Sequence, residues 1–336
     1  MSTERIEEAT EVTTPRLRAW RQIDMAEVLW RYGILIVWLA IAIIFSILRP
    51  ETFFTFGNVQ TIAGSQAVLV VVALALVPTL TAGEFDASVS SVTGISLVLI
   101  GWLSVLHHWP IGLAIVAALG VGLLVGAINA FFVVVAQVQS IVVTLGMGTL
   151  LIGAALGINS LSTGGISQKL VNATHMNLLG LPLAFYYGLL LTALFWYVLS
   201  FTPLGRYLYF VGAGRSVARL SGIPVDMIRA GSFIAGSFFS ALAGVILAGW
   251  ISASDPNVGP TYLLPAFAAA FLGSSVLEPG RFNPWGTFIA VYFLVTGVVG
   301  LELLGLAGWI EQVFYGASLV LAVAISRFAT RRRFNV

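Results

Sequence analysis

The chain alternates long apolar runs with short polar turns, and this pattern predicts a bundle of membrane-spanning helices. The runs lack the alternation of polar and apolar positions that a membrane-spanning strand shows, so helices are expected. A spanning helix needs about 20 mostly apolar residues. Ten runs approach that length, and they cover residues 31–48, 58–80, 88–106, 111–135, 140–158, 182–201, 230–251, 262–277, 285–304 and 309–326. The run at 262–277 is short and alanine-rich, which is typical of a partial or tilted span.

One polar segment, residues 202–229, interrupts this apolar pattern, and we call it the polar island. Because long apolar runs lie on both sides, the island must stand in water at a membrane face. Its centre, 214–220, predicts a short helix with two arginines four positions apart on one side. Such a helix between two spans is typical of a docking site for a soluble partner. The island carries four of the 16 basic residues of the chain: Arg206, Arg215, Arg219 and Arg229.

Composition supports an all-α integral membrane protein. The chain is 59% hydrophobic and only 9% charged, whereas a soluble domain carries about 25% charged residues. It has no cysteine, which excludes a disulfide framework and a thiolate metal site. The formal charge of +2 is too small to indicate a nucleic-acid partner.

The distribution of lysine and arginine predicts how the chain is oriented. With the N-terminus in the cytoplasm, the N-terminal tail, the polar island, Arg281 and the C-terminal arginines all fall inside, which leaves Arg49 and Lys169 outside. Both termini are then cytoplasmic, so the number of spans must be even, which agrees with ten. The longest outer segment is 159–181, which either docks an external partner or is a solvated loop.

We therefore expect one transmembrane domain between two tails. Residues 1–29 are predicted to be a disordered cytoplasmic tail, because their first part is polar and of mixed charge. Residues 30–327 form the transmembrane domain, with the polar island as its cytoplasmic loop. Residues 328–336 form a basic cytoplasmic tail, whose arginines anchor the inner face and contact membrane lipid.

Two carboxylates, Glu84 and Asp86, fall where the second predicted span ends and the third begins. In one interpretation Asp86 caps the third helix through the amides near Ser88, and Glu84 is an exposed loop residue. In the other, the break lies partly within the membrane and lines a polar pathway, since carboxylates in membranes are costly and usually face a cavity. The residues alone leave both interpretations open.

Neutral polar side chains around the fourth and fifth spans extend the second interpretation. Amide and hydroxyl groups suit a polyhydroxylated substrate, because sugars are bound by such groups together with aromatic faces. The candidate residues for a translocation path or gate are Glu84, Asp86, Ser88, Asn129, Gln139 and Thr144.

An enzyme is not expected. The one lysine of the chain, Lys169, does not lie in a phosphate-binding P-loop, so the chain is not expected to hydrolyse ATP itself. Among the histidines, His107 and His108 stand beside Trp109 and Pro110, a sequence typical of a membrane-interface anchor, and no metal site is expected. An ion-coupled secondary transporter is the main alternative; apart from residues 84–86, the predicted spans have no ionisable group near their centres.

Three stretches resemble the permease subunits of bacterial ABC sugar importers of the ribose, xylose, arabinose and galactose group. TAGEFDASVSSVTG at 81–94 is similar to the family's GG-I-D-L-S-V-G-S segment, and VQSIVVTLGMGTLLIGAA at 138–155 to its fifth-span stretch. The most specific is TPLGRYLYFVGAGRSVARLSGIPVDMIR at 202–229, followed further on by ASDPNVGPTYLLPAFAAAFLGSS at 253–275. The resemblance covers roughly residues 30–330.

Some positions depart from the family pattern. Glu84 replaces a small residue, Ala87 stands where leucine is common, and Arg215 replaces the asparagine of a Gly-Asn pair. Phe271 and Ser274-Ser275 alter the eighth-span motif. The additional acid at Glu84 leaves open a polyol or sugar derivative rather than an ordinary pentose or hexose.

The resemblance implies the fold and partners of a vitamin B12-type (type II) importer, with about ten helices in each permease. Two permeases, identical or paralogous, enclose a central path above two cytoplasmic ABC ATPases, and a periplasmic sugar-binding protein delivers the substrate. ATP and magnesium would be bound by the ATPases, and this chain needs no cofactor. The polar island would hold the coupling helix, whose expected contact residues are Gly212, Gly214, Arg215, Ala218, Arg219, Leu220, Ser221 and Gly222.

Overall fold

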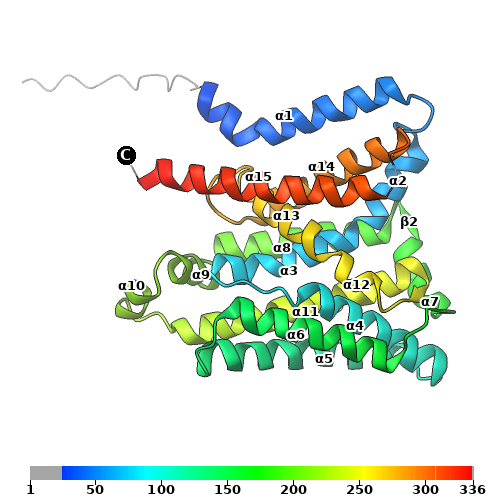
Figure 1. The fold of residues 1–336 in the computed structure, drawn as a ribbon, viewed down its shortest axis with the longest axis horizontal. Helices are drawn as coiled ribbons and strands as arrows, with labels where there is room; N and C mark the ends of the chain where they lie inside the picture. Colours follow the sequence, from blue (N-terminus) through cyan, green and yellow to red (C-terminus); the bar gives the residue numbers. More distant parts are fainter. Residues whose placement is uncertain (1–24, 307, 335–336) are drawn as a thin grey trace, which may run out of the picture.

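The computed structural model describes residues 25–306 and 308–334, which form a bundle of helices running roughly side by side (Figure 1). The first helix begins at Met25, inside the predicted tail 1–29, and the rest of that tail lies outside the described residues. The last helix continues to Phe334, through most of the predicted C-terminal tail. The helices are α1 (Met25–Leu48), α2 (Phe56–Ser65), α3 (Ala67–Thr81), α4 (Val89–Gly101), α5 (Ile111–Ala130), α6 (Ser140–Ile158), α7 (Gln168–His175), α8 (Leu183–Phe201), α9 (Pro203–Ala213), α10 (Arg215–Leu220), α11 (Val225–Ile251), α12 (Val258–Thr261), α13 (Leu263–Gly273), α14 (Pro284–Leu303) and α15 (Trp309–Phe334).

Seven helical stretches are long and apolar enough to cross a membrane, counted over the described residues. They correspond to seven of the ten predicted runs, and the other three runs form the shorter apolar helices Tyr32–Leu48, Val258–Gly273 and Trp309–Ala324. The alanine-rich run forms α13, which has only 11 residues and is too short to cross the bilayer alone. The protein is therefore a multi-pass all-α membrane protein.

Two of the long stretches end in wider turns. A π-helical turn η1 (Trp102–Leu106) follows α4, and η2 (Phe131–Val135) follows α5. Both turns lie within predicted runs, because a π turn shifts the backbone hydrogen bonds without changing the apolar pattern.

The outer segment predicted at 159–181 is folded in the structure. It contains β1 (Thr163–Gly164), which pairs antiparallel with β4 (Ala253–Ser254) directly after α11. A second antiparallel pair joins β2 (Asn177–Leu178) to β3 (Leu181–Pro182). Between the two pairs, α7 packs on α11, and His175 stacks on Trp250 with ring centroids 4.5 Å apart. The segment is thus attached to α11 at two points.

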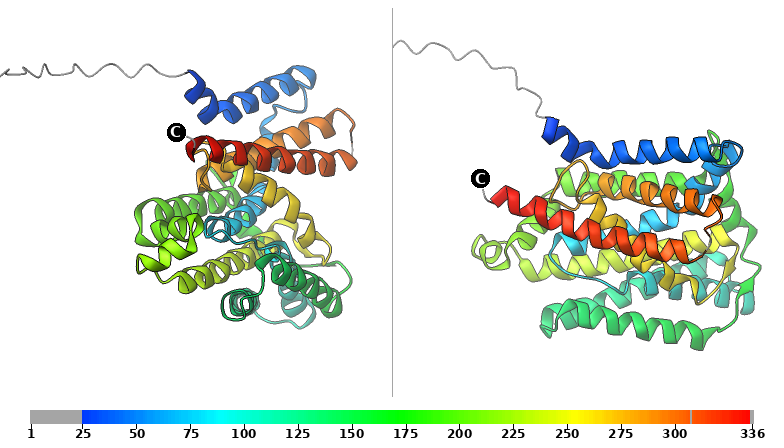
Figure 2. Two further views of the ribbon diagram at one scale, coloured as in Figure 1. Left: turned by 60° about the vertical axis from the view of Figure 1, so that its left-hand side comes forward. Right: turned by 45° about the horizontal axis from the view of Figure 1, so that its top comes forward.

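Helices α3 and α11 form the centre of the bundle (Figures 1 and 2). Every residue of α3 is buried, as expected of a helix that is apolar on all sides. Helix α11 packs mainly against α3, α4 and α5. On α5, Gly122 and Gly126 meet the α11 backbone so closely that an added Cβ atom would lie 2.8 Å from the Ser237 carbonyl oxygen or 2.7 Å from the Ile234 Cα. Small residues allow this approach of two helices.

The two ends of the bundle differ in content. Helices α9 and α10, the start of α1 and the end of α15 lie at one end, and α7 and β2 lie at the other (Figure 1). This arrangement agrees with the prediction that Lys169, on α7, is separated from the polar island. Helix α1 lies on the outside of the bundle, where Trp38 Nε1 donates a 2.9 Å hydrogen bond to Thr296 Oγ1 of α14.

Candidate functional site

The connection between α3 and α4, residues 83–88, is mostly buried although it is rich in polar groups; Gly83 and Phe85 are its exposed residues. Gly83 has a φ of +76°, a conformation that glycine adopts without strain, and the chain reverses direction there. The backbone amide of Glu84 then donates to the Thr79 carbonyl at 2.9 Å. Glu84, Asp86 and Ser88 are each at most 3% exposed. The connection therefore brings three of the candidate residues into the interior.

Asp86 lies two residues before Ser88, which is the N-cap residue of α4, and no side-chain hydrogen bond caps that helix. The first of the two interpretations therefore holds only for the contact with Ser88. Asp86 Oδ1 accepts hydrogen bonds from the Ser88 amide at 3.0 Å and from the Ser88 hydroxyl at 2.6 Å. Asn129 of α5 donates from Nδ2 to the same hydroxyl oxygen at 2.9 Å. Asp86 Oδ2 and Asn129 Oδ1 are buried without a hydrogen-bond partner among the described residues, so this polar cluster keeps two free acceptors.

Helix α6 holds the other side of the connection. The Ser140 hydroxyl accepts from the Phe85 amide at 3.3 Å, and the Thr144 hydroxyl accepts from the Ala87 amide at 3.0 Å. Five of the six candidate residues thus lie together, and Gln139 is separate from them on the exposed turn before α6. Gln139 instead lines a polar cavity of about 420 Å³ that Glu84 also borders.

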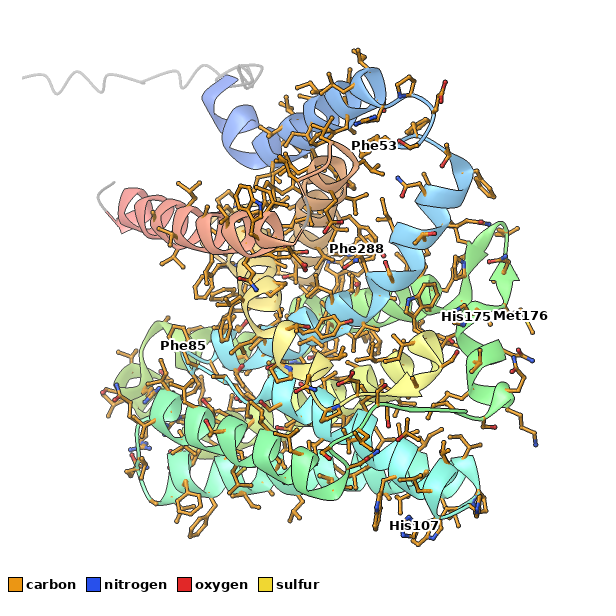
Figure 3. The ribbon with its side chains drawn as sticks, turned by 45° about the vertical axis from the view of Figure 1, so that its right-hand side comes forward. Phe53, Phe85, His107, His175, Met176 and Phe288 are labelled. Atoms are coloured by element: carbon orange, nitrogen blue, oxygen red, sulfur yellow. The ribbon has the colours of Figure 1, made fainter. Side chains whose placement is uncertain are left out.

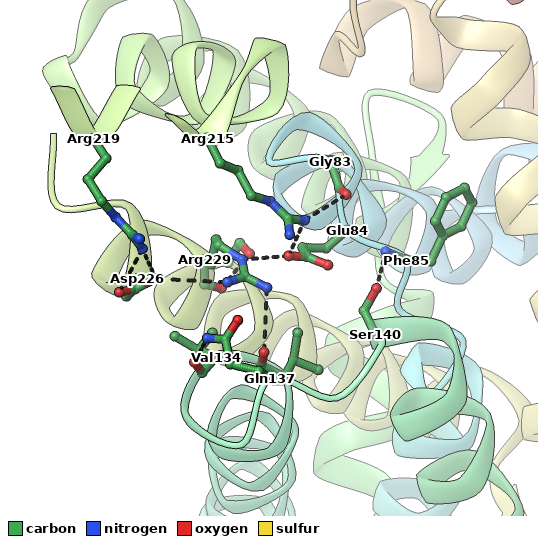
Figure 4. Close-up of polar contacts among 12 residues, drawn as sticks. Gly83, Glu84, Phe85, Val134, Gln137, Ser140, Arg215, Arg219, Asp226 and Arg229 are labelled. Atoms are coloured by element: carbon green, nitrogen blue, oxygen red, sulfur yellow. Dashed lines mark hydrogen bonds and ion pairs between the residues drawn. The ribbon is translucent and has the colours of Figure 1, made fainter. Parts of the chain in front are cut away.

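The carboxylate of Glu84 lies between two arginines of the polar island (Figure 4). Its Oε1 is 2.6 Å from Nη2 of Arg215 on α10 and 2.6 Å from Nε of Arg229 on α11. The side chains of Glu84 and Arg229 are 3% and 6% exposed, whereas that of Arg215 is 47% exposed. The capping interpretation, which makes Glu84 an exposed loop residue, is therefore wrong on this point. Two of the departures from the family pattern, Glu84 and Arg215, contact each other.

The predicted short helix of the polar island is α10, and it stands at the surface of the bundle. Arg219 pairs with Asp226 at 3.0 Å, in a contact that is exposed on both sides. Ala218 is buried, whereas Val217 and Leu220 are 67% and 89% exposed. Of the expected coupling residues, Arg215 and Ala218 hold α10 to the bundle, and Leu220 points away from it.

Helix α9 fixes this end of the island to the membrane helices. Gly212 lies against the end of α3, where an added Cβ atom would overlap the Thr81 carbonyl oxygen. On the same helix, the Tyr209 hydroxyl donates to the Phe282 carbonyl at 2.7 Å. Burial and the nearby Glu278 raise the pKa of Tyr209 to about 12, against the opposing charge of Arg281. The phenol therefore stays protonated and keeps this hydrogen bond.

An aromatic cluster lies on the opposite side of the connection. The ring of Phe85 is stacked against Phe267 and Phe271 of α13, with centroids 6.3 and 6.2 Å away. Phe85 is 43% exposed and projects from the connection (Figure 3). The same backbone segment thus carries the carboxylate that meets the polar island and the ring that meets α13.

Sequence reasoning did not assign Arg229 or Phe85 to the site. The topology contained a usable signal for Arg229: it places Glu84 at the same membrane face as the polar island, and a buried carboxylate needs a cation. No comparable signal marks Phe85, because phenylalanine is frequent throughout the chain.

The three histidines lie apart from the candidate residues named above. His107 stacks on Trp102 with ring centroids 4.1 Å apart, and His175 lies on α7 (Figure 3). Over the described part of the chain, no group of three or more histidines, aspartates or glutamates lies close enough together to hold a metal ion.

The family to which the chain belongs follows from comparison with known proteins. Residues 58–323 match the family described as branched-chain amino acid transport system / permease component. The chain belongs to this permease family. It is 30% identical to the ribose import permease protein RbsC of Haemophilus influenzae over 289 residues, which cover 84% of this chain and 88% of the relative.

A second relative is the autoinducer 2 import system permease protein LsrD of Escherichia coli O9:H4 (strain HS). It is 29% identical over 260 residues, which cover 75% of this chain and 78% of the relative. No solved structure matches the chain significantly. The relatives are transport permeases rather than enzymes, and the resemblance to ABC importer permeases found in the sequence is confirmed.

Proposed function

We propose that the chain is the membrane-spanning subunit of an ATP-driven importer for a monosaccharide or a related polyhydroxylated solute. The observation that carries the proposal is the short exposed helix α10 between two membrane helices, in a chain that matches the permease family over most of its length. Val217 and Leu220 on α10 offer an apolar surface to a soluble protein. The ribose and autoinducer 2 permeases among the relatives support a sugar-like substrate.

The partners follow from this role. Cytoplasmic ABC ATPase subunits bind at α10 and hold the ATP and magnesium, since this chain needs no nucleotide site of its own. A second permease, identical or paralogous, completes the translocation path, and a periplasmic binding protein delivers the substrate. In this arrangement the chain lies in the bacterial inner membrane with both termini in the cytoplasm, because the polar island, the start of α1 and the end of α15 share one end of the bundle.

The hydroxyl and amide groups around residues 83–88 are proposed to border the path. Asp86 and Ser88 belong to the connection and Asn129 and Thr144 lie beside it, and the free Oδ atoms of Asp86 and Asn129 are available to accept hydrogen bonds. The carboxylate of Glu84, in contrast, is occupied by two arginines at the α10 end. We therefore assign substrate contact to the neutral groups and to Asp86 rather than to Glu84.

Reconstitution tests the proposal. The chain is incorporated into liposomes with its cognate ATPase and binding protein, and uptake is measured for a panel of labelled pentoses, hexoses and polyols. ATP inside the liposomes should drive uptake, and an ionophore that collapses ion gradients should leave it unchanged. Uptake by the chain alone, driven by an ion gradient, would instead support a secondary transporter.

A further inference from the structure

The contact between Glu84 and Arg215 joins the helix at the cytoplasmic surface to the buried connection between α3 and α4. We propose that this ion pair is the link through which a movement of α10 reaches Phe85, so that Arg215 and Glu84 are positioning residues for transport. The inference rests on the proposed function, since it requires a partner that moves α10.

Helix α10 itself has few other attachments to the bundle. It has six residues, of which Ala218 alone is buried. Its second arginine, Arg219, pairs with the exposed Asp226 of α11, a contact that solvent screens. Arg215 reaches inward instead, where its Nη2 contacts Glu84 at 2.6 Å and the Gly83 carbonyl at 3.4 Å. Within the described residues, these two contacts of Arg215 join α10 to the connection.

The connection is suited to move as one unit when Glu84 is displaced. Arg229 binds the same carboxylate oxygen from α11, so Glu84 is held between a helix of the bundle core and the surface helix (Figure 4). Residues 83–88 contain no helix, and the amides of Phe85 and Ala87 are held by the Ser140 and Thr144 side chains rather than by backbone carbonyls. Such bonds to side-chain hydroxyls adjust by rotation about χ1.

The ring of Phe85 is the outer end of this unit. Phe85 directly follows Glu84 in the chain, and its ring packs on Phe267 and Phe271 of the short helix α13. Displacement of Glu84 therefore changes how Phe85 lies against α13. Because a single aromatic contact is weak, a small displacement of Glu84 is enough to change it.

The reconstituted transporter tests the link through the number of substrate molecules imported for each ATP hydrolysed. Arg215→Gln removes the link. Arg206→Gln is the control, because Arg206 is an exposed arginine of the polar island on α9 and is not among the expected coupling residues. A coupling free energy of about 1 kcal/mol corresponds to about a fivefold effect. We expect Arg215→Gln to lower the ratio at least about fivefold while the ATPase still co-purifies, and Arg206→Gln to keep the wild-type ratio.

Three outcomes separate the two proposals. A wild-type ratio in Arg215→Gln, or an equal fall in both variants, overturns the link and leaves the importer function intact. Glu84→Gln provides an independent variant: it should lower the ratio in the protein that remains folded, and a wild-type ratio there overturns the link as well. If the wild-type complex binds its ATPase but shows no uptake that depends on ATP, the proposed function itself is wrong.

Discussion

The buried contact between Glu84 and Arg229 predicts that neutralising Glu84, Arg229 or Arg215 lowers the free energy of unfolding by different amounts. In Glu84→Gln, the guanidinium of Arg229 stays buried with only the Val133 carbonyl at 3.5 Å and Asp226 at 3.8 Å. Removing one partner of a buried ion pair costs about 3–5 kcal/mol. Because these two weaker contacts remain, we expect a loss near the lower limit, about 3 kcal/mol of unfolding free energy.

The other two variants should cost less, for reasons visible in the geometry. Arg229→Gln leaves Glu84 with its 2.6 Å contact to Arg215, so we expect about 2 kcal/mol. Arg215→Gln removes a partner that is 47% exposed, and solvent screening limits such a pair to about 1 kcal/mol or less. The double variant Glu84→Gln with Arg229→Gln should lose less than the sum, since neither charge is then left buried alone.

Denaturant unfolding in detergent, followed by far-ultraviolet circular dichroism, measures these differences as a double-mutant cycle. Arg219→Gln is the control, because its partner Asp226 is exposed. The reasoning is refuted if Arg215→Gln destabilises the protein as much as Glu84→Gln, or if the two buried substitutions are strictly additive.

Three further predictions concern other parts of the molecule. Gly126→Val should destabilise the protein by about 1–3 kcal/mol, the usual cost of overpacking, because an added Cβ atom would lie 2.7 Å from the Ile234 Cα of α11. Gly120→Val is the control, since a Cβ atom there would meet nothing within 4 Å. Equal melting temperatures of the two variants would contradict the packing of α5 on α11. Replacing residues 214–222 with a flexible linker should abolish co-purification of the ATPase while the permease still inserts; retained binding would rule out α10 as the docking element. In this chain without cysteine, an impermeant thiol reagent added outside cells should label Lys169→Cys and not Val217→Cys, and labelling of both would overturn the proposed orientation.

The fold could be predicted from the sequence to a large extent, because the requirement for a continuous apolar run is strong in a membrane. The runs at 111–135 and 140–158 have the same limits in the structure as in the sequence, when the π turn after α5 is included. The start of α11 lies five residues before the predicted run at 230–251, because the helix begins at Val225 within the polar island. A helix that projects into water keeps its hydrogen bonds without an apolar sequence, so hydropathy does not mark its start.

The candidate site could be predicted only in part. Asp86 and Ser88 are close in sequence, and their contact follows from the tendency of an aspartate side chain to accept a hydrogen bond from the amide two residues further on. The contacts of Glu84 with Arg215 and Arg229 join residues more than 130 positions apart, and no local pattern specifies them. The sequence also does not tell which small residues pack against another helix. Gly122 and Gly126 contact α11, whereas Gly120 faces open space.

The length of α11 has a mechanical consequence. Its 27 residues span about 40 Å, with Arg229, which contacts Glu84, near one end and Trp250, which stacks on His175, near the other. The tight contact with Gly122 and Gly126 falls near its middle, at Ile234 to Ala241, and no α5 side chain stands between the two backbones there. If α11 tilts as a rigid helix about this contact, each degree of tilt shifts its two ends by ~0.35 Å in opposite directions, given the rise of a helix. The folded segment at 159–181 and the carboxylate of Glu84 thus contact opposite ends of one rigid helix.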